Sequence, residues 1–144
     1  MTRFAEIEVG DVLETASRTI TEADLVNFAG VSGDFNGLHT DAERMGELEF
    51  GERIAHGALV FSVATGLLWQ ARDRPSHVVA FYGVDHLRFV APVFVGDTIA
   101  VRSEVVGKEP REHPTANGTV RYDTTVSNQH GEMVLSCEVL SLVT

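Results

Sequence analysis

The segment from His56 to Gln70 constrains the fold of this chain more than any other. Its apolar residues recur at helical spacing and cover nearly the whole circumference, so the sequence predicts a helix that is hydrophobic on almost every side. Such a helix needs another part of the chain to wrap around it. The residues that set the pattern are Leu59, Val60, Val63, Ala64, Leu67 and Leu68. We expect Phe61 and Trp69 to pack in the core too, or to line a tunnel beside it.

Strand-like runs supply the wrapping layer. An early run, Val12 to Thr19, alternates loosely between apolar and polar residues. Four later runs are rich in Val, Thr, Tyr and Phe and are separated by Gly-containing turns, so we expect an antiparallel meander. These runs are Val78–Phe89, Thr98–Val106, Thr119–Asn128 and Met133–Leu142. The predicted class is α+β, with a curved antiparallel sheet wrapped around one long helix.

Helix-end signals organise the segment between the early strand and the apolar helix. Thr21 to Asp24 resembles a capping box, which predicts a short helix directly after Thr21. Gly33 and the polar residues around it should end that helix in a loop. A further helical turn is expected over Asp41–Met45.

Composition limits the classes of protein. The 144 residues are 44% hydrophobic, which fits one domain over residues 1–144. The net charge of −10 argues against nucleic acid as a partner, because that binding requires a basic face. No apolar run is long enough for a signal peptide or a membrane span, so we expect a cytoplasmic protein with no membrane partner. The single cysteine, Cys137, is expected to be a small buried residue.

Three polar residues that could form a functional site, Asp34, Asn36 and His39, lie in the glycine-rich loop before the apolar helix. On a continuous helix Asp34 and His39 would diverge by about 140°, so only an irregular backbone can direct both at one point. A carboxylate beside an imidazole can hold it in one tautomer and make it more basic, which suits removal of a proton from water. The pair is therefore a candidate acid–base site.

Gly57 is a second candidate, because it lies where the apolar helix should begin. The amides at a helix N-terminus are unpaired and carry partial positive charge, and glycine permits close approach of a ligand. Its N–H is thus a candidate donor to a developing oxyanion. We expect His56, just before it, to be a cap or a loop contact outside the catalytic pair.

The loop resembles the hydratase motif of a known family. Phe28 followed by Ser32-Gly-Asp-Phe-Asn-Gly-Leu-His39 is similar to the motif of MaoC-like dehydratases and (R)-specific enoyl-CoA hydratases, with Gly37 in place of the usual proline. The similarity continues through Ile54–Gly57 and through Leu87–Thr98, and it covers most of the chain. It implies a hot dog fold and a homodimer whose sheets join edge to edge.

The resemblance also implies a reaction: hydration of a trans-2-enoyl thioester, expected to be a coenzyme A ester, to a 3-hydroxyacyl thioester. Asp34 and His39 would hold and activate water, Gly57 would donate to the thioester carbonyl, and Asn36 would support the loop. Thr65 falls where some family members have a serine, and it is a candidate for substrate binding. No cofactor is expected, because hydration is redox neutral and coenzyme A is part of the substrate.

An acyl-CoA substrate needs a local basic patch on this acidic chain. We predict Arg88, in the family-like segment, and Arg102, in a following strand, as contacts to the coenzyme A phosphates.

Other functions stay open. On the same scaffold, the chain could dehydrate a carrier-protein substrate, act on branched or dicarboxylic acyl groups, or cleave thioesters. It could also be a non-catalytic acyl-binding subunit. The remaining histidines show no ligand spacing, so we expect no metal. There is neither a dinucleotide fingerprint nor a nucleophile elbow.

Overall fold

The computed structural model of the chain describes residues 3–72 and 76–144. In chain order, the elements are η1 (Phe4–Glu6), β1 (Val12–Glu14), β2 (Arg18–Thr19), α1 (Glu22–Ser32), α2 (Gly37–Thr40), α3 (Ala42–Gly46), α4 (Gly57–Ala71), β3 (Val78–Phe89), β4 (Thr98–Pro110), β5 (Gly118–Ser127) and β6 (Met133–Val143).

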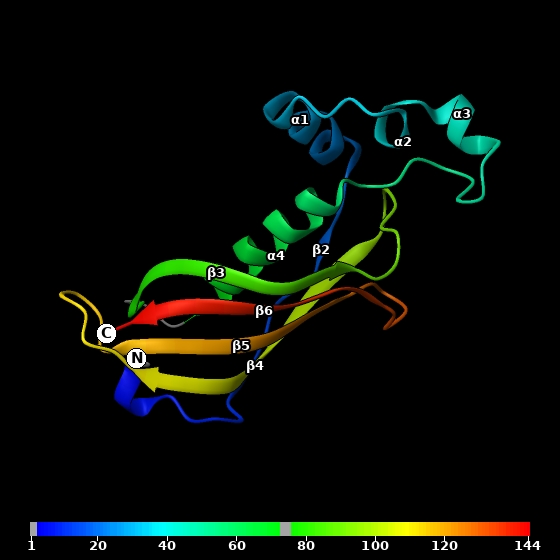
Figure 1. Cartoon of the computed structure of the whole chain (residues 1–144). Coiled ribbons are helices and arrows are strands. Elements are labelled where there is room, and N and C mark those ends of the chain that lie inside the picture. The colour runs from blue at the N-terminus through cyan, green and yellow to red at the C-terminus, as the bar shows by residue number, and fades with distance from the viewer. Residues whose placement is uncertain (1–2, 73–75) are drawn as a thin grey trace.

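The strands form one antiparallel sheet in the order β1-β4-β5-β6-β3, and β2 pairs with β4 beyond β1 (Figure 1). The single early strand that we expected over Val12–Thr19 is therefore two short strands, β1 and β2, which both pair with β4. Strands β4, β5 and β6 make the predicted meander. The prediction was wrong for β3, which pairs with β6 and not with β4.

The connection between β3 and β4 explains this difference. The Ala55 amide donates to the Val93 carbonyl at 2.7 Å, and Ile54 forms a β-bridge with Phe94. The connection is thus paired with the segment that leads into α4, and it does not close a hairpin. As a consequence, β3 becomes an edge strand and this connection lies beside the start of α4.

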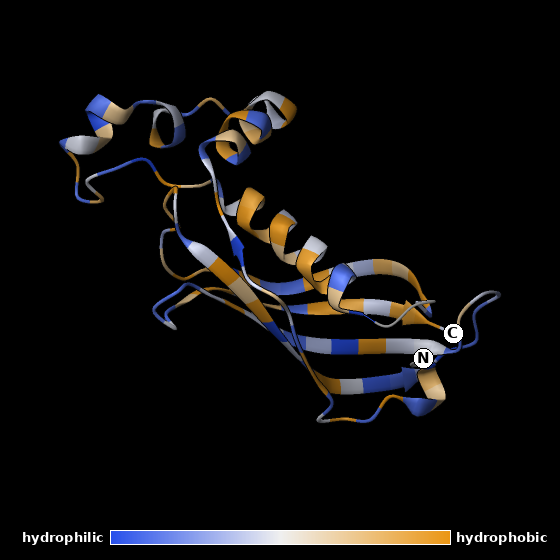
Figure 2. Ribbon diagram, turned by 180° about the vertical axis from the view of Figure 1, so that it is seen from behind, coloured by the Kyte–Doolittle hydropathy of each residue, from blue (hydrophilic) through white to orange (hydrophobic). Residues whose placement is uncertain are grey.

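Helix α4 lies against one face of the curved sheet, and its ribbon is mostly hydrophobic (Figure 2). All six residues that set its predicted apolar pattern are buried in one core cluster with residues of the sheet. The predicted arrangement of a curved sheet around a long helix is confirmed. Phe61 is partly buried and packs against this cluster. The core prediction was wrong for Trp69, whose exposed fraction is 50%.

The helix-end predictions are confirmed. The Asp24 amide donates to Thr21 Oγ1 while Asp24 Oδ2 accepts from the Thr21 amide at 2.8 Å, and this capping box begins α1. Gly33 ends the helix in the left-handed conformation, with φ of 74°. The Asp41 side chain caps α3. Helices α1, α2 and α3 gather beyond the N-terminal end of α4 (Figure 1). None of the helices in the described residues is long and apolar enough to cross a membrane.

Candidate active site

The loop that follows α1 is built from short side-chain-to-backbone hydrogen bonds. Asp34 Oδ1 accepts from the Asn36 amide at 3.1 Å, and Asn36 Oδ1 accepts from the Leu38 amide at 3.0 Å, which caps α2. His39 lies on this new, four-residue helix. The backbone between Asp34 and His39 is thus irregular. This confirms the prediction, because on a continuous helix the two side chains would point about 140° apart, whereas here they approach each other.

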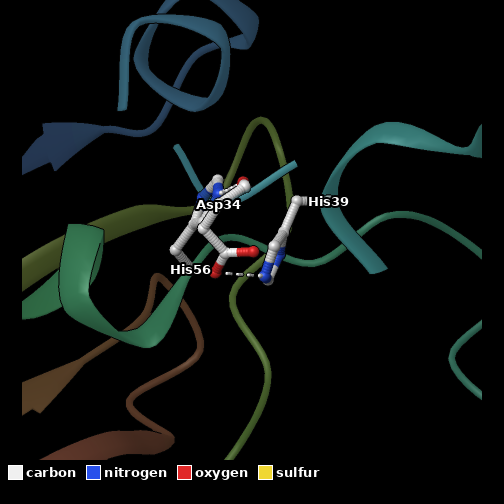
Figure 3. Close-up of side chains that lie close together, drawn as sticks. All are labelled: Asp34, His39 and His56. Carbon is white, nitrogen blue, oxygen red and sulfur yellow. Dashed lines mark hydrogen bonds and ion pairs between the residues drawn. The ribbon is translucent and has the colours of Figure 1, made fainter. Parts of the chain in front are cut away.

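His39 is oriented by the backbone. The residue is 8% exposed, and its Nδ1 lies 2.7 Å from the Ile54 carbonyl oxygen. A carbonyl only accepts, so Nδ1 carries the hydrogen and Nε2 of the neutral ring keeps its lone pair. Nε2 lies 3.7 Å from Asp34 Oδ2, beyond the range of a direct hydrogen bond (Figure 3). The Ile54 carbonyl therefore fixes the tautomer, and not the carboxylate as predicted.

His56 is the residue that sequence reasoning left outside the site. It is only 2% exposed, and its ring stacks on that of His39 with centroids 3.7 Å apart and an interplanar angle of 25°. Its Nε2 lies 2.9 Å from the Asp34 carbonyl oxygen. The side chain makes no capping bond to α4. The sequence contains one indication of this placement. His56 directly precedes Gly57, so it must lie close to any group that binds at the start of α4.

Gly57 and His39 line the same pocket, whose volume is about 370 Å³. Gly57 is the first residue of α4, where an amide has no carbonyl partner within the helix. The Phe89 ring lies so close that a Cβ on Gly57 would be 2.8 Å from its atoms. The other walls are mostly apolar: Phe50, Ile54, Ala55, Val60, Val90, Ala91, Pro92, Val93 and Val134.

The remaining candidates are not gathered at this pocket. Thr65 lies two turns along α4, roughly 12 Å from Gly57 at 1.5 Å per residue, and its hydroxyl donates to the Ser62 carbonyl. Arg88 is exposed on β3, directly before the pocket residue Phe89, and forms no ion pair with a described residue.

Arg102 lies elsewhere. Its neighbours along β4 are buried while it is exposed, so it faces away from α4. There it pairs with Glu104 at 2.9 Å and Glu14 at 4.0 Å. The structure does not bring it to the site.

An ion pair ties α1 to the segment before α4. The Arg53 guanidinium donates to both carboxylate oxygens of Glu22 and lies 3.4 Å from the His39 carbonyl oxygen. These hydrogen bonds and the positive charge hold the pKa of Glu22 below its usual value. The pair thus fixes α1 beside the candidate site.

Three residues of the described part of the chain could hold a cation. Asp34, His39 and His56 offer donor atoms within 4.8 Å of one another. Each imidazole already uses one nitrogen on a backbone carbonyl, which leaves one nitrogen per ring. The expectation that the protein needs no metal remains a prediction.

A helix wrapped by a curved sheet, with a carboxylate and an imidazole near the helix start, defines a hot dog fold protein with a candidate acid–base site. Residues 4–128 match the family described as MaoC like domain, and the chain belongs to that family.

Curated relatives share this sequence over most of its length. Protein MaoC of Klebsiella aerogenes is 42% identical over 134 residues, which are 88% of this chain; the chain spans only 39% of that relative. The 3-hydroxyacyl-thioester dehydratase Z of Mycobacterium tuberculosis is 34% identical, covering 87% of this chain and 82% of the relative. The (R)-specific enoyl-CoA hydratase of Rhodospirillum rubrum is 32% identical, covering 97% and 90%.

Solved structures agree on the fold. A monoamine oxidase regulatory protein from Archaeoglobus fulgidus superposes with a TM-score of 0.91 at 41% identity, covering 99% of this chain and 94% of its own. A double hotdog protein from Mycobacterium tuberculosis, at 23% identity, gives a TM-score of 0.85 over 99% of this chain and 44% of its own. The predicted hot dog fold is confirmed.

Proposed function

We propose that this chain hydrates a trans-2-enoyl-CoA to a 3-hydroxyacyl-CoA, and catalyses the reverse dehydration, at the pocket lined by His39 and Gly57, with Asp34 beside His39. Its family and its relatives make it a hydratase or dehydratase of acyl thioesters. The observation that carries the finer proposal is that one mostly apolar pocket is lined by both His39 and Gly57.

The geometry supports a mechanism in which water lies between the acid–base pair. The 3.7 Å between His39 Nε2 and Asp34 Oδ2 is too long for a direct hydrogen bond but short enough for one water to contact both. That water donates one hydrogen to Nε2 and the other to the carboxylate, and its oxygen attacks Cβ of the enoyl group. Nε2 takes one proton as the water oxygen bonds to Cβ, and the protonated imidazole then gives that proton to Cα of the enolate, so the elements of water are added and both side chains return to their starting states.

Gly57 supports the other end of the reacting system. Negative charge develops on the thioester oxygen as Cβ is attacked, and a fixed amide donor aimed at that oxygen lowers the barrier. The Gly57 amide begins α4, where the helix dipole adds to the attraction. The volume of about 370 Å³ fits a short acyl thioester.

Arg88 is the proposed contact for the coenzyme A phosphates, because it is exposed, forms no ion pair with a described residue and directly precedes the pocket residue Phe89 in β3. Raising the salt concentration should raise KM for crotonyl-CoA more than KM for a crotonyl-pantetheine thioester, which lacks the nucleotide. Arg88→Ala should reduce that difference, whereas Arg102→Ala, which removes an arginine already paired with Glu104 and Glu14, serves as the matched control. Equal salt responses for both substrates would exclude Arg88.

We further propose a homodimer joined along β3. Among the described residues, β3 pairs only with β6, which leaves its other edge free, and it carries the exposed side chains of Phe81 and Tyr82. A free edge with exposed aromatic residues favours pairing with a second copy. Sedimentation equilibrium should show twice the 15.7 kDa mass of one chain. A single 15.7 kDa species at micromolar concentration would refute the dimer.

Loss of enoyl absorbance on crotonyl-CoA tests the proposed activity directly. Asp34→Asn and His39→Ala should each lower kcat by at least about 10²–10³-fold, because a positioned acid or base contributes roughly 10²–10⁴-fold. Circular dichroism should show that both variants stay folded. Near wild-type hydration by either folded variant would refute the assignment of the pair.

The same assay separates the alternatives. Preference for a carrier-protein thioester, or for a branched or dicarboxylic enoyl-CoA, would change the substrate but keep the site. Release of free thiol without hydration would indicate a thioesterase. Binding of acyl-CoA without either reaction would indicate a non-catalytic subunit.

Dialysis against EDTA should leave activity unchanged, because the proposed chemistry requires no metal. We also propose a cytoplasmic location.

A further inference from the structure

His39 and His56 each form a hydrogen bond to the segment that contains the other histidine. His39, on the loop side, bonds through Nδ1 to the Ile54 carbonyl at 2.7 Å. His56, on the helix side, bonds through Nε2 to the Asp34 carbonyl at 2.9 Å. Between these two bonds the imidazole rings stack face to face at 3.7 Å (Figure 3). Gly57 directly follows His56 in the chain, so one buried residue bonds the Asp34 backbone, stacks on His39 and adjoins the start of α4.

The protonation state of His56 follows from its partners. Since the Asp34 carbonyl oxygen only accepts, His56 Nε2 must carry a hydrogen. His56 Nδ1 is buried and has no hydrogen-bond partner among the described residues. A second proton on Nδ1 would create a buried, unpartnered donor and a buried charge against the neighbouring ring. The geometry therefore favours a neutral ring in the Nε2–H tautomer.

We infer that His56 is a positioning residue of the hydratase site, which fixes Asp34 and His39 relative to each other and to the Gly57 amide. This inference rests on the proposed function. The His56 bond holds the backbone of Asp34, and its ring supports one face of the His39 imidazole, which also limits rotation of that base. Being neutral, the His56 ring can lie against His39 while His39 takes up the proton from water, whereas a charged ring would repel it.

Two substitutions separate the two contacts. His56→Gln keeps an N–H donor near the position of Nε2 but removes the stacked ring. His56→Phe keeps a flat ring but removes the donor. His113→Gln, at an exposed histidine of the connection between β4 and β5, is the matched control for the loss of an imidazole.

We expect both His56 variants to lower kcat on crotonyl-CoA by about 10–100-fold, the usual range for residues that orient others, with KM within about two-fold of wild type. The control should retain wild-type kcat. A purely structural role gives a different result: thermal stability falls, but kcat per folded molecule does not. That result, or a change confined to KM, would overturn the inference.

Nitrogen-15 NMR of the histidine rings tests the geometry without turnover and without any variant. In the wild-type protein at about pH 7, we expect His56 to be neutral with its hydrogen on Nε2, and His39 to carry its hydrogen on Nδ1. A hydrogen on His56 Nδ1 would overturn the inference even if both variants were inactive. If the wild-type protein hydrates no enoyl thioester, the proposed function fails, and the positioning role for hydration fails with it. The NMR result then shows separately whether the bond to Asp34 exists.

Discussion

Adding one methyl group at Gly57 should damage the activity far more than the stability. A Cβ at this position would lie 2.8 Å from three atoms of the Phe89 ring, whereas carbon atoms pack at about 3.5–4.0 Å. In Gly57→Ala, the ring must therefore retreat by roughly 1 Å. Phe89 is 55% exposed and can move toward solvent, so we expect less than the 1–3 kcal/mol typical of overpacking, about 1 kcal/mol at most.

The displaced ring is a wall of the pocket beside the proposed oxyanion donor. A shift of about 1 Å in positioning can cost roughly 100-fold in rate, so we expect kcat/KM for crotonyl-CoA to fall by about 10–100-fold. Gly66→Ala is the matched control, because it adds the same methyl group to the same helix with no atom within 4 Å.

Alanine stabilises a helix interior by up to about 1 kcal/mol relative to glycine, so Gly66→Ala should raise Tm by roughly 2–4 °C and leave activity unchanged. Urea unfolding and the crotonyl-CoA assay measure both effects. Wild-type kcat/KM in Gly57→Ala, or equal losses of activity in the two variants, would refute the reasoning.

Three further outcomes follow from local features. Gly37 is the first residue of α2, where proline needs no amide hydrogen, and Asn36 has the extended ψ of 140° that proline prefers before it. Gly37→Pro should therefore stabilise the protein by about 0.4–1 kcal/mol in urea unfolding; a destabilised variant would contradict this geometry. The pKa of Glu22 is lowered by its hydrogen bonds to Arg53. The pair therefore stabilises the fold at pH values above the pKa of Glu22 in the unfolded chain, and this stabilisation is lost as the pH falls through the pKa of Glu22 in the folded protein. Between about pH 6 and pH 3, Tm should fall less in Glu22→Gln than in wild type, by an amount worth under about 1 kcal/mol, since the pair is exposed; parallel curves would exclude this contribution. Burial raises the pKa of Cys137 to about 11, so the thiol should react slowly with an aromatic disulfide reagent at pH 8 and quickly in urea. Fast reaction of the native protein would show that the residue is accessible.

Local chemistry could be predicted from the sequence because its causes are local. The Thr21 and Asp24 capping box, the left-handed Gly33 and the apolar pattern of α4 each depend on residues within a few positions of one another. The order of the strands depends on distant contacts. Nothing within the connection from Val90 to Asp97 indicates that Val93 bonds to Ala55, and that contact displaces β3 to the far edge of the sheet.

The candidate site shows the same division. Proximity of Asp34 and His39 could be predicted from one loop, since five residues and an irregular backbone determine it. The stacking of His56 on His39 could not, because it joins residues 17 positions apart across two elements. Arg102 illustrates the opposite case: its type suits a phosphate, but its strand faces it toward Glu14 and Glu104, and only the register of β4 reveals this.

The position of the candidate loop also depends on nonlocal contacts. Glycine at position 37 removes the conformational restriction that proline would give, which alone would leave the loop loose. Three long-range hydrogen bonds compensate: His39 to the Ile54 carbonyl, His56 to the Asp34 carbonyl, and the Ile54 amide to the Leu38 carbonyl at 3.0 Å. All three join the loop to the segment that begins α4. The candidate acid–base pair is therefore tied to the segment that begins α4, although the loop has glycine at position 37.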